Sequence, residues 1–379
     1  MNLFLIYFFL IYGTAHLYFY LKLNSGFSPS VSARFLLAIF LLAMIVAPVA
    51  VRLLERDGHE NIARTTAYIG YNWMGFLFLF ISLAFLLEAM RFLLWLGHFF
   101  TRMPRPYLLE SAPFMIFCLL VAAGISIYGW FEAQDLRIER RQIYTEKLPP
   151  GSQPIKIAQI TDLHIGLIVR EKQVNKVVAA IHNIKPDLLV ATGDIVDGHV
   201  SHFDGISELF KGLELPLGMV AIPGNHEYYA GFGQARQFLL KSGFTFMRSE
   251  ARAAGENLWL VGIDDPVAKR SGDFRSEDEA RLLSEAPRDK FIVMLKHRPV
   301  VEKDSLSRFD LQLSGHVHKG QIFPFNLLTW ISFPVRAGLT QPAESSWLYV
   351  SRGTGTWGPP IRFMSPPEVS VIELLPKQR

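Results

Sequence analysis

The hydrophobic pattern of the chain changes in kind near residue 132. Before that point, long and nearly uncharged apolar runs follow one another; after it, short apolar runs alternate with helical patterns. A helix needs about twenty apolar residues to cross about 30 Å of hydrocarbon. The pattern therefore predicts four membrane spans and then a globular part, the spans lying at roughly 3–22, 34–53, 72–96 and 112–131.

Basic residues in the loops bear on the orientation of these spans. With four spans, one side of the membrane carries the globular part together with Arg52, Arg56, Arg64, Arg137, Arg140 and Arg141. The opposite side carries Lys22, Arg34, Arg102 and Arg105. Because cytoplasmic loops are enriched in Lys and Arg, this small excess favours a cytoplasmic globular part.

Glu88, Arg91 and His16 are polar residues within the predicted spans. Glu88 and Arg91 are three residues apart and share a helix face, so they are either a mutually neutralising pair near the interface or a functional pair. His16 either packs within the bundle or contacts a lipid headgroup. The sequence leaves both alternatives open.

The chain after Phe131 predicts a layered fold of helices and strands around a largely buried sheet. We divide it into a linker at 132–153, with an edge strand in RIERRQIYTEKL, and a catalytic domain at 154–379 that follows the transmembrane region 1–131. The expected strands are 155–160, 187–192, 218–222, 291–295 and 311–313, with a hairpin formed by 244–250 and 257–264. Helices are expected at 170–184, 235–243 and 276–286.

Composition narrows the possible functions. The net charge is +4, and the basic residues form no stripe, which argues against a nucleic-acid partner. Cys118 is the single cysteine, so an internal disulfide is excluded.

Five of the predicted strands end in side chains that can bind a metal ion. These side chains are Asp162 and His164, Asp194, Asn225 with His226, His297, and His316 with His318. Side chains alternate along a strand, so each Asp-x-His or His-x-His pair is expected to share one face. In layered α/β proteins, ligands bind beyond the carboxyl ends of strands, so the five ends can converge on one site.

The number of these groups indicates two metal ions. Two Asp, one Asn and four His, with His226 in addition, are too many for one closed zinc site, and no cysteine accompanies them. Two five- or six-coordinate divalent ions that share a carboxylate fit the set. Oxygen and imidazole ligands are compatible with Mn²⁺, Fe or Zn²⁺.

The motifs D-x-H, G-D, G-N-H-E, a later His and G-H-x-H, in this order across residues 153–375, resemble the calcineurin-like metallophosphoesterase superfamily. The resemblance implies a sandwich of two sheets flanked by helices and a pair of divalent ions, with manganese favoured. It implies that Asp194 bridges the ions and that the remaining ligands divide into Asp162, His164 and His318 for one ion and Asn225, His297 and His316 for the other. It also implies a catalytic group of His226, Asp194 and Asn225.

The same resemblance implies a reaction. A metal-bridging hydroxide attacks phosphorus in line, and His226 gives a proton to the leaving group. Arg298 or Lys319 binds the remaining phosphate charge, or else both are solvated surface residues.

The segment 349–374 narrows the resemblance to membrane-anchored phosphohydrolases, including the lipid A pathway hydrolases of UDP-diacylglucosamine. Lys319 departs from the glycine usual at that position. Residues 322–338 are apolar and rich in proline, and are expected to form a loop that either packs on the core or dips into the membrane interface.

These patterns together predict a multi-pass protein of a bacterial inner membrane that hydrolyses a phosphoester or pyrophosphate bond in a lipid-linked substrate. Its partners are expected to be the bilayer and a membrane lipid or lipid-linked phosphate, with the oligomeric state open. One alternative is a membrane-tethered phosphodiesterase or phosphatase for a soluble nucleotide or small phosphoester. Another is a receptor or scaffold whose domain only binds, and a transporter is disfavoured because the spans lack broken helices in matching halves.

Overall fold

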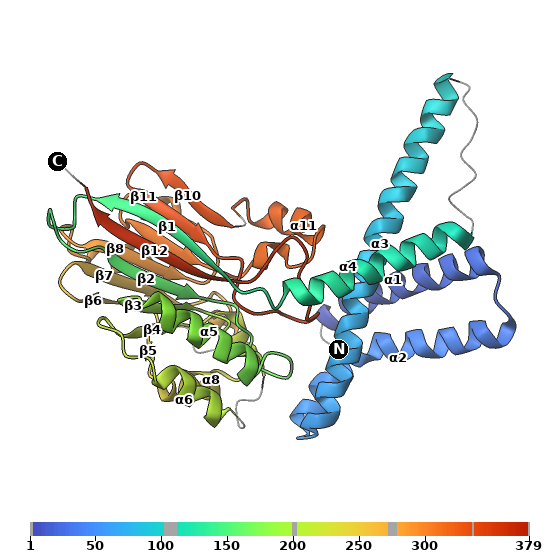
Figure 1. The fold of residues 1–379 in the computed structure, drawn as a ribbon, viewed down its shortest axis with the longest axis horizontal. Coiled ribbons are helices and arrows are strands. Elements are labelled where there is room, and N and C mark those ends of the chain that lie inside the picture. Colours follow the sequence, from blue (N-terminus) through green and yellow to red (C-terminus); the bar gives the residue numbers. More distant parts are fainter. Residues whose placement is uncertain (1–2, 102–111, 199–202, 272–278, 336, 378–379) are drawn as a thin grey trace. The chain divides into compact units, whose positions relative to one another are not determined.

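The computed structural model describes residues 3–101, 112–198, 203–271, 279–335 and 337–377. They form two compact units, one of Met1–Phe131 with Gly358–Ile361 and one of Glu132–Trp357 with Arg362–Arg379. Figure 1 shows the first unit as helices and the second as two stacked sheets with helices outside them.

The helical unit contains α1 (Leu3–Phe27), α2 (Val31–Arg56), α3 (Glu60–Thr101) and α4 (Ala112–Glu132). Among the described residues, three helices are long and apolar enough to cross a membrane, over Val31–Arg56, Glu60–Gly97 and Ala112–Glu132. The prediction of four such spans is thereby corrected to three, although α1 does form a helix over the first predicted span. The expected long loop before the third span is largely helical, because α2 ends at Arg56 and α3 begins at Glu60.

Polar side chains inside this unit have partners from other helices. The indole of Trp73 donates to Nε2 of His16 at 2.9 Å, and Nδ1 of His16 lies 2.7 Å from the carbonyl of Tyr12, so His16 packs within the bundle. Glu88 forms an ion pair with Lys22 of α1.

The second unit contains two six-stranded mixed sheets. The first has the strand order β1-β12-β2-β3-β4-β5 and the second β10-β11-β9-β8-β7-β6. The bounds are β1 Arg137–Thr145, β2 Ile155–Ile160, β3 Leu188–Thr192, β4 Met219–Ile222, β5 Thr245–Phe246, β6 Glu250–Ala254, β7 Leu258–Ile263, β8 Phe291–Lys296, β9 Leu311–Ser314, β10 Gly338–Ala343, β11 Ser346–Val350 and β12 Glu368–Pro376. The strands β2, β3, β4 and β5 run parallel, as do β7, β8, β9 and β11, so the carboxyl ends within each set lie at one edge.

The helices of this unit are short. They are α5 (Glu171–Ile184), α6 (Asp204–Lys211), α7 (Asn225–Ala230), α8 (Phe232–Lys241), α9 (Ala268–Ser271), α10 (Glu279–Ser284) and α11 (Phe325–Ser332), with 3₁₀ turns η3 (Lys303–Ser305) and η4 (His318–Gly320). Helices α5, α6 and α8 cover the outer face of the first sheet (Figure 1).

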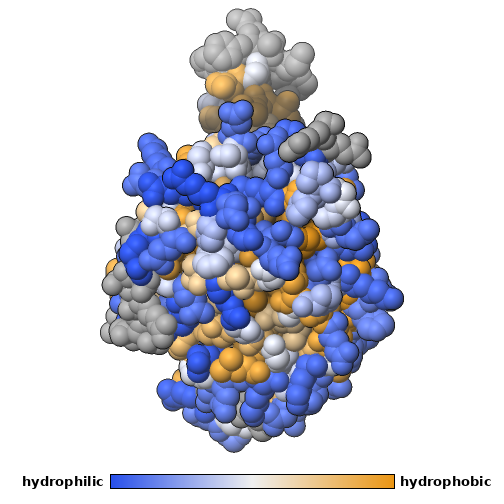
Figure 2. All heavy atoms as spheres, turned by 90° about the vertical axis from the view of Figure 1, so that its left-hand side faces the viewer, coloured by the Kyte–Doolittle hydropathy of each residue, from blue (hydrophilic) through white to orange (hydrophobic). Residues whose placement is uncertain are grey.

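Alternation along the strands separates two hydrophobic layers. Leu188 and Val190 of β3 lie in the core between the sheets, whereas Leu189 and Ala191 face the helices. Both faces of β3 are therefore buried, as expected for a parallel strand covered on both sides. On the face of the molecule in Figure 2, by contrast, hydrophilic side chains surround smaller hydrophobic patches.

The predicted strands at 155–160, 187–192, 218–222, 291–295 and 311–313 are confirmed as β2, β3, β4, β8 and β9. The hairpin prediction was wrong in part, because 245–246 joins β4 in the first sheet and β7 pairs instead with β6. Residues 325–332, expected as a loop, form the helix α11.

Candidate metal centre

Both sheets contribute side chains to one site at the carboxyl ends of their parallel strands. Asp162 and His164 follow β2, and Asp194 follows β3. Asn225 and His226 open α7 directly after β4. From the second sheet, His297 follows β8, and His316 and His318 follow β9.

Three overlapping groups of these side chains could each hold a metal ion, since their ligand atoms lie within 4.8 Å of one another. The groups are Asp162 with His164 and His318, His164 with Asp194 and His226, and Asp194 with His297 and His316. His164 and Asp194 each belong to two groups, so the three form one continuous cluster.

The backbone brings the paired residues together in a way that the sequence did not predict. Strand β2 ends at Ile160 and β9 ends at Ser314, so neither Asp162 and His164 nor His316 and His318 lie within a strand. Their φ angles are instead positive, at 53° for Asp162, 54° for His164, 73° for His316 and 47° for His318. Such angles are uncommon outside glycine, and they cluster at functional sites where the surrounding structure holds them. The prediction that strand alternation places each pair on one face is therefore wrong.

Glycine at 315 lets the two sheets approach at this site. A Cβ atom there would lie 2.2 Å from both Oδ2 of Asp162 and Oγ1 of Thr161. In its absence, the backbone N–H of His316 donates to both carboxylate oxygens of Asp162, at 2.9 Å each. This contact fixes the end of β9 against the end of β2.

Hydrogen bonds set the orientation of His297. Its Nδ1 lies 2.8 Å from the carbonyl of Thr192 and donates to it, which leaves Nε2 without a proton in the neutral ring. That Nε2 lies 3.1 Å from Oδ2 of Asp194 and 3.2 Å from Nδ1 of His316. Nε2 of His297 therefore points into the cluster. Burial lowers the pKa of this ring, but the charge of Asp194 outweighs burial and raises the pKa to about 10, so the ring would bind a metal ion only on losing its Nε2 proton.

Burial and charge divide the pKa values of the histidines. Burial, reinforced by His226, lowers the pKa of His164 to about 3, and burial with the nearby His297 lowers that of His316 to about 3. Burial also lowers the pKa of His318. These three rings are neutral at pH 7, which is the form that binds metal ions.

His226, like His297, has a raised pKa. Burial lowers its pKa, but the charges of Asp194 and then Asp197 outweigh burial and raise the pKa to about 9. Nδ1 of His226 lies 2.6 Å from Oδ1 of Asp197, so the carboxylate fixes the ring, and the backbone N–H of His226 donates to Asp194 at 2.8 Å. His226 is thus a protonated imidazole at the edge of the cluster, flanked by the exposed rings of Tyr229 and Trp357.

The carboxylates respond to the same surroundings. Burial raises the pKa of Asp162 to about 6 against the opposing effect of His297. Burial also acts to raise the pKa of Asp194, but His297 and His226 outweigh it and hold that pKa below its ordinary value. Asp194, which belongs to two of the three ligand groups, is therefore ionised.

Three residues of the site had no predicted role. Asp197 holds His226, and Glu227 accepts backbone N–H groups of Asp194, Ile195, Val196 and Gly224 at 2.7–3.1 Å. Arg362 is fully buried, and its Nη2 lies 3.2 Å from Nδ1 of His318. The sequence does contain a signal for the first two, since Asp197 follows Asp194 by three residues and Glu227 adjoins His226.

The two residues predicted to bind phosphate differ in their surroundings. Arg298 donates to both oxygens of Asp265, at 2.8 and 3.2 Å, so its charge is already paired. Lys319 is half-buried in η4 with a φ of 50°.

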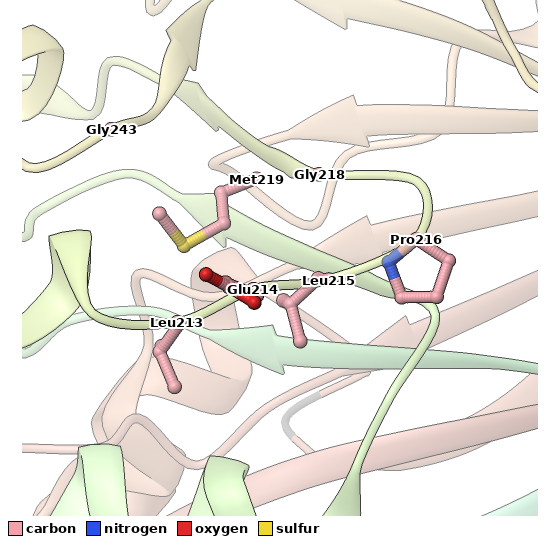
Figure 3. A pocket seen from close by; sticks show the side chains of 7 residues that line it. All are labelled: Leu213, Glu214, Leu215, Pro216, Gly218, Met219 and Gly243. Atoms are coloured by element: carbon pink, nitrogen blue, oxygen red, sulfur yellow. The ribbon is translucent and has the colours of Figure 1, made fainter.

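A hollow of about 530 Å³ lies elsewhere, lined by Leu213, Glu214, Leu215, Pro216, Gly218, Met219 and Gly243 (Figure 3). Met219 is the first residue of β4, whereas Asn225 and His226 of the metal centre follow the last residue of β4. The hollow is therefore separate from the cluster.

With this geometry in place, comparison with known proteins decides the family. A family model described as calcineurin-like phosphoesterase matches residues 155–320. A protein of Aquifex aeolicus (strain VF5) named an uncharacterized metallophosphoesterase is 38% identical over 258 residues, which are 68% of this chain and 98% of that protein. The chain belongs to the calcineurin-like metallophosphoesterases. It is a metal-dependent phosphoesterase with the two-sheet fold expected from its motifs.

Two other relatives are longer than the shared region. A metallophosphoesterase of Helicobacter pylori strain J99 is 32% identical over 64% of this chain and 65% of its own length. A Danio rerio protein named a transmembrane protein with metallophosphoesterase domain is 29% identical over 68% of this chain and 62% of its own length. The chain thus spans less than two thirds of each. The second name agrees with the three candidate spans.

Proposed function

We propose that this metallophosphoesterase is an integral membrane enzyme that uses two metal ions to hydrolyse a phosphoester or pyrophosphate bond of a lipid-linked substrate. The observation that carries the proposal is the meeting of side chains from both sheets in three overlapping groups, in each of which the ligand atoms lie within 4.8 Å of one another. We assign Asp162, His164 and His318 to one ion, and Asn225, His297 and His316 to the other. Asp194 is shared by both.

Two features of the cluster fit cations. Oδ1 of Asn225 is buried with no hydrogen-bond partner among the described residues. Nε2 of His164 lies 3.1 Å from Nε2 of His318, and both rings are neutral, so the two nitrogens can share at most one proton. One divalent ion would accept the lone pairs of His164 and His318, and the other would accept the amide oxygen of Asn225. A mixed oxygen and imidazole set favours Mn²⁺, Fe or Zn²⁺, with manganese as our choice.

When bound, such ions polarise phosphoryl oxygens and activate a water molecule at neutral pH. The protein itself supplies the proton for the leaving group. Asp197 holds Nδ1 of His226 and leaves Nε2 to reach the departing oxygen, and the raised pKa keeps that proton in place at neutral pH. Lys319 and Arg298 are the proposed contacts for the remaining phosphate charge, and Arg298 would act while held by Asp265.

The lipid-linked substrate and the cytoplasmic side belong to the same proposal. Three candidate spans exceed what a simple anchor needs, and the large apolar side chains of α11 are exposed just after the last metal motif. The orientation does not depend on α1, because the α2–α3 turn and the chain after α4 lie on one side for three spans as well as four. A soluble nucleotide or small phosphoester remains the alternative substrate.

Hydrolysis by the detergent-purified full chain with Mn²⁺ tests the proposal, using a UDP-linked diacyl sugar and bis(p-nitrophenyl) phosphate in parallel. Asp194→Ala is the inactive variant, and Asp204→Ala, whose side chain is 85% exposed, is the matched control. The proposal is supported if the chain hydrolyses the lipid faster than the soluble ester and if Asp194→Ala, but not Asp204→Ala, abolishes this activity. Turnover of the soluble ester alone would favour the alternative, a soluble substrate. Turnover of neither substrate would contradict both the lipid-linked and the soluble substrate class.

A further inference from the structure

The helix α11 is amphipathic, but its apolar side faces outward. At 100° per residue, Leu327, Leu328, Trp330 and Ile331 form one continuous face, and Asn326, Thr329 and Ser332 occupy the other. The four apolar side chains are 54%, 57%, 56% and 78% exposed. Asn326 and Thr329, by contrast, are half-buried against the protein. A surface helix of a soluble domain has the opposite arrangement.

The surroundings of α11 continue this apolar surface. The chain carries no charged residue between Lys319 and Arg336. Phe323 and Phe325 are 38% and 44% exposed, and Met364, next to Phe363 in the segment that pairs with the chain before α11, is 58% exposed. A contiguous exposed surface of this kind marks a contact with a membrane or another protein.

Hydrogen bonds within the catalytic unit connect α11 to the end of a candidate span. Glu132, the last residue of α4, is buried, and its carboxylate accepts the backbone N–H groups of Ser365 at 2.8 Å and Met364 at 3.2 Å. The adjacent Phe363 pairs with the chain just before α11, donating to the carbonyl of Gln321 at 2.9 Å and accepting from Phe323 at 3.1 Å. The start of α11 is thus tied to the residue at which α4 ends.

We infer that α11 lies in the bilayer interface with Leu327, Leu328, Trp330 and Ile331 among the acyl chains. The inference rests on the proposed function and deepens it. Where α4 ends, the chain leaves the hydrocarbon, so an apolar face tied to that point lies at the depth where Trp and long apolar side chains are stable. The absence of charge from this stretch favours lipid over a soluble protein partner, whose interface would also need polar complementarity.

The position of α11 also selects the substrate class. Phe333, directly after α11, packs edge to face on the ring of His316 at 5.4 Å between centroids. If α11 is held in the membrane interface, Phe333 and the side of the metal cluster that it contacts therefore lie at the depth of the lipid phosphates. The site is placed to take a phosphate whose acyl chains remain in the membrane, with those chains along α11.

Depth-dependent quenching tests the inference on the full chain. Leu328→Cys in a Cys118→Ser background is labelled with an environment-sensitive fluorophore and reconstituted into vesicles of phosphatidylcholine and phosphatidylglycerol with spin-labelled acyl chains. Leu240→Cys is the matched control, an exposed leucine on α8 of the same domain. The inference predicts several-fold stronger quenching at 328 than at 240.

Equal and weak quenching at both positions would overturn the inference. A blue-shifted emission at 328 without quenching would also overturn it, because the face would then be covered by protein. Quenching reports position and no turnover. It can therefore fail while hydrolysis is observed, and hydrolysis can fail while quenching is observed.

Discussion

At the scale of single residues, the division of the histidines into three with lowered pKa values and two, His226 and His297, with raised pKa values depends on charges within a few ångströms. His164, His316 and His318 are buried without an adequate counter-charge, so burial keeps them neutral. His226 is equally enclosed but has Asp194 and Asp197 close by, and it keeps its proton. Opposite pKa shifts of the same side chain therefore follow from the placement of carboxylates.

Asp197→Asn tests the role of that carboxylate. Removal of the anion lowers the pKa of His226, so the protonated acid is lost at a lower pH and the alkaline limb of the kcat profile moves to lower pH. The rate at neutral pH falls roughly 10–100-fold, as for other residues that orient a catalytic group. The measurement is kcat against pH with a phosphodiester substrate. Asp204→Asn is the control, and an unmoved alkaline limb in Asp197→Asn would refute this role.

At the scale of elements, the site is a junction between two sheets. Asp162, Asp194 and Asn225 come from the ends of β2, β3 and β4, and His297 and His316 come from the ends of β8 and β9. Buried histidine nitrogens and carboxylates that face one another without cations between them are costly. Metal ions that bind the folded chain but not the unfolded chain would relieve this cost, and would therefore stabilise the folded state by linkage.

Chelation is predicted to lower the thermal stability of the catalytic unit. Removal of the ions leaves the ends of the two sheets held by fewer contacts, and the apparent unfolding temperature falls by several degrees, corresponding to roughly 1–3 kcal/mol. Differential scanning fluorimetry of the purified chain with and without EDTA measures the change, and added Mn²⁺ restores it. Identical curves before and after chelation would show that the cluster holds no stabilising ion.

The sequence predicted strands and helices best where the hydrophobic pattern of a short segment is enough to determine them. The strands β2, β3, β4, β8 and β9 are short, largely apolar runs with turn residues after them, and α5 has a regular apolar stripe. The residues after those strands could therefore be named in advance. Their backbone conformation could not, because positive φ angles at Asp162 and His316 follow from contacts between the two sheets rather than from local sequence.

Other features depend on distant contacts and were missed for the same reason. Residues 245–246 look like half of a hairpin, yet they pair with β4, which is more than twenty residues earlier in the chain. Arg362 reaches His318 across 44 positions, a separation that no local motif encodes. The stretch that forms α11 was expected to be a loop, and its exposed apolar face is recognised only when burial is known.

At the scale of the whole molecule, the membrane part and the catalytic unit together define where the reaction occurs. If the candidate spans α2, α3 and α4 cross the bilayer as proposed, the α2–α3 turn and the chain after Glu132 lie on one side of it. That side carries Arg52, Arg56 and Arg64 together with the arginines of β1. From the positive-inside tendency, we propose that this side is the cytoplasm.

The orientation is testable with one exposed position. Tyr144 lies on β1 and is 62% exposed, so Tyr144→Cys in a Cys118→Ser background gives a single reactive thiol on the catalytic unit. A membrane-impermeant maleimide should label it only after the cells are permeabilised. Labelling of intact cells would place the catalytic unit on the outer side and reverse the proposed topology.

The binding of Mn²⁺ by the purified chain tests the central claim most directly, because every proposed role depends on a shared two-ion cluster. Metal analysis after equilibrium dialysis is predicted to give about two ions per chain for the wild type and about one or none for Asp194→Ala, which removes the carboxylate common to both ions. Asp204→Ala, at an exposed site, should match the wild type. One ion per chain in the wild type, or two in Asp194→Ala, would contradict the assignment of Asp194 as the bridge between two metal ions.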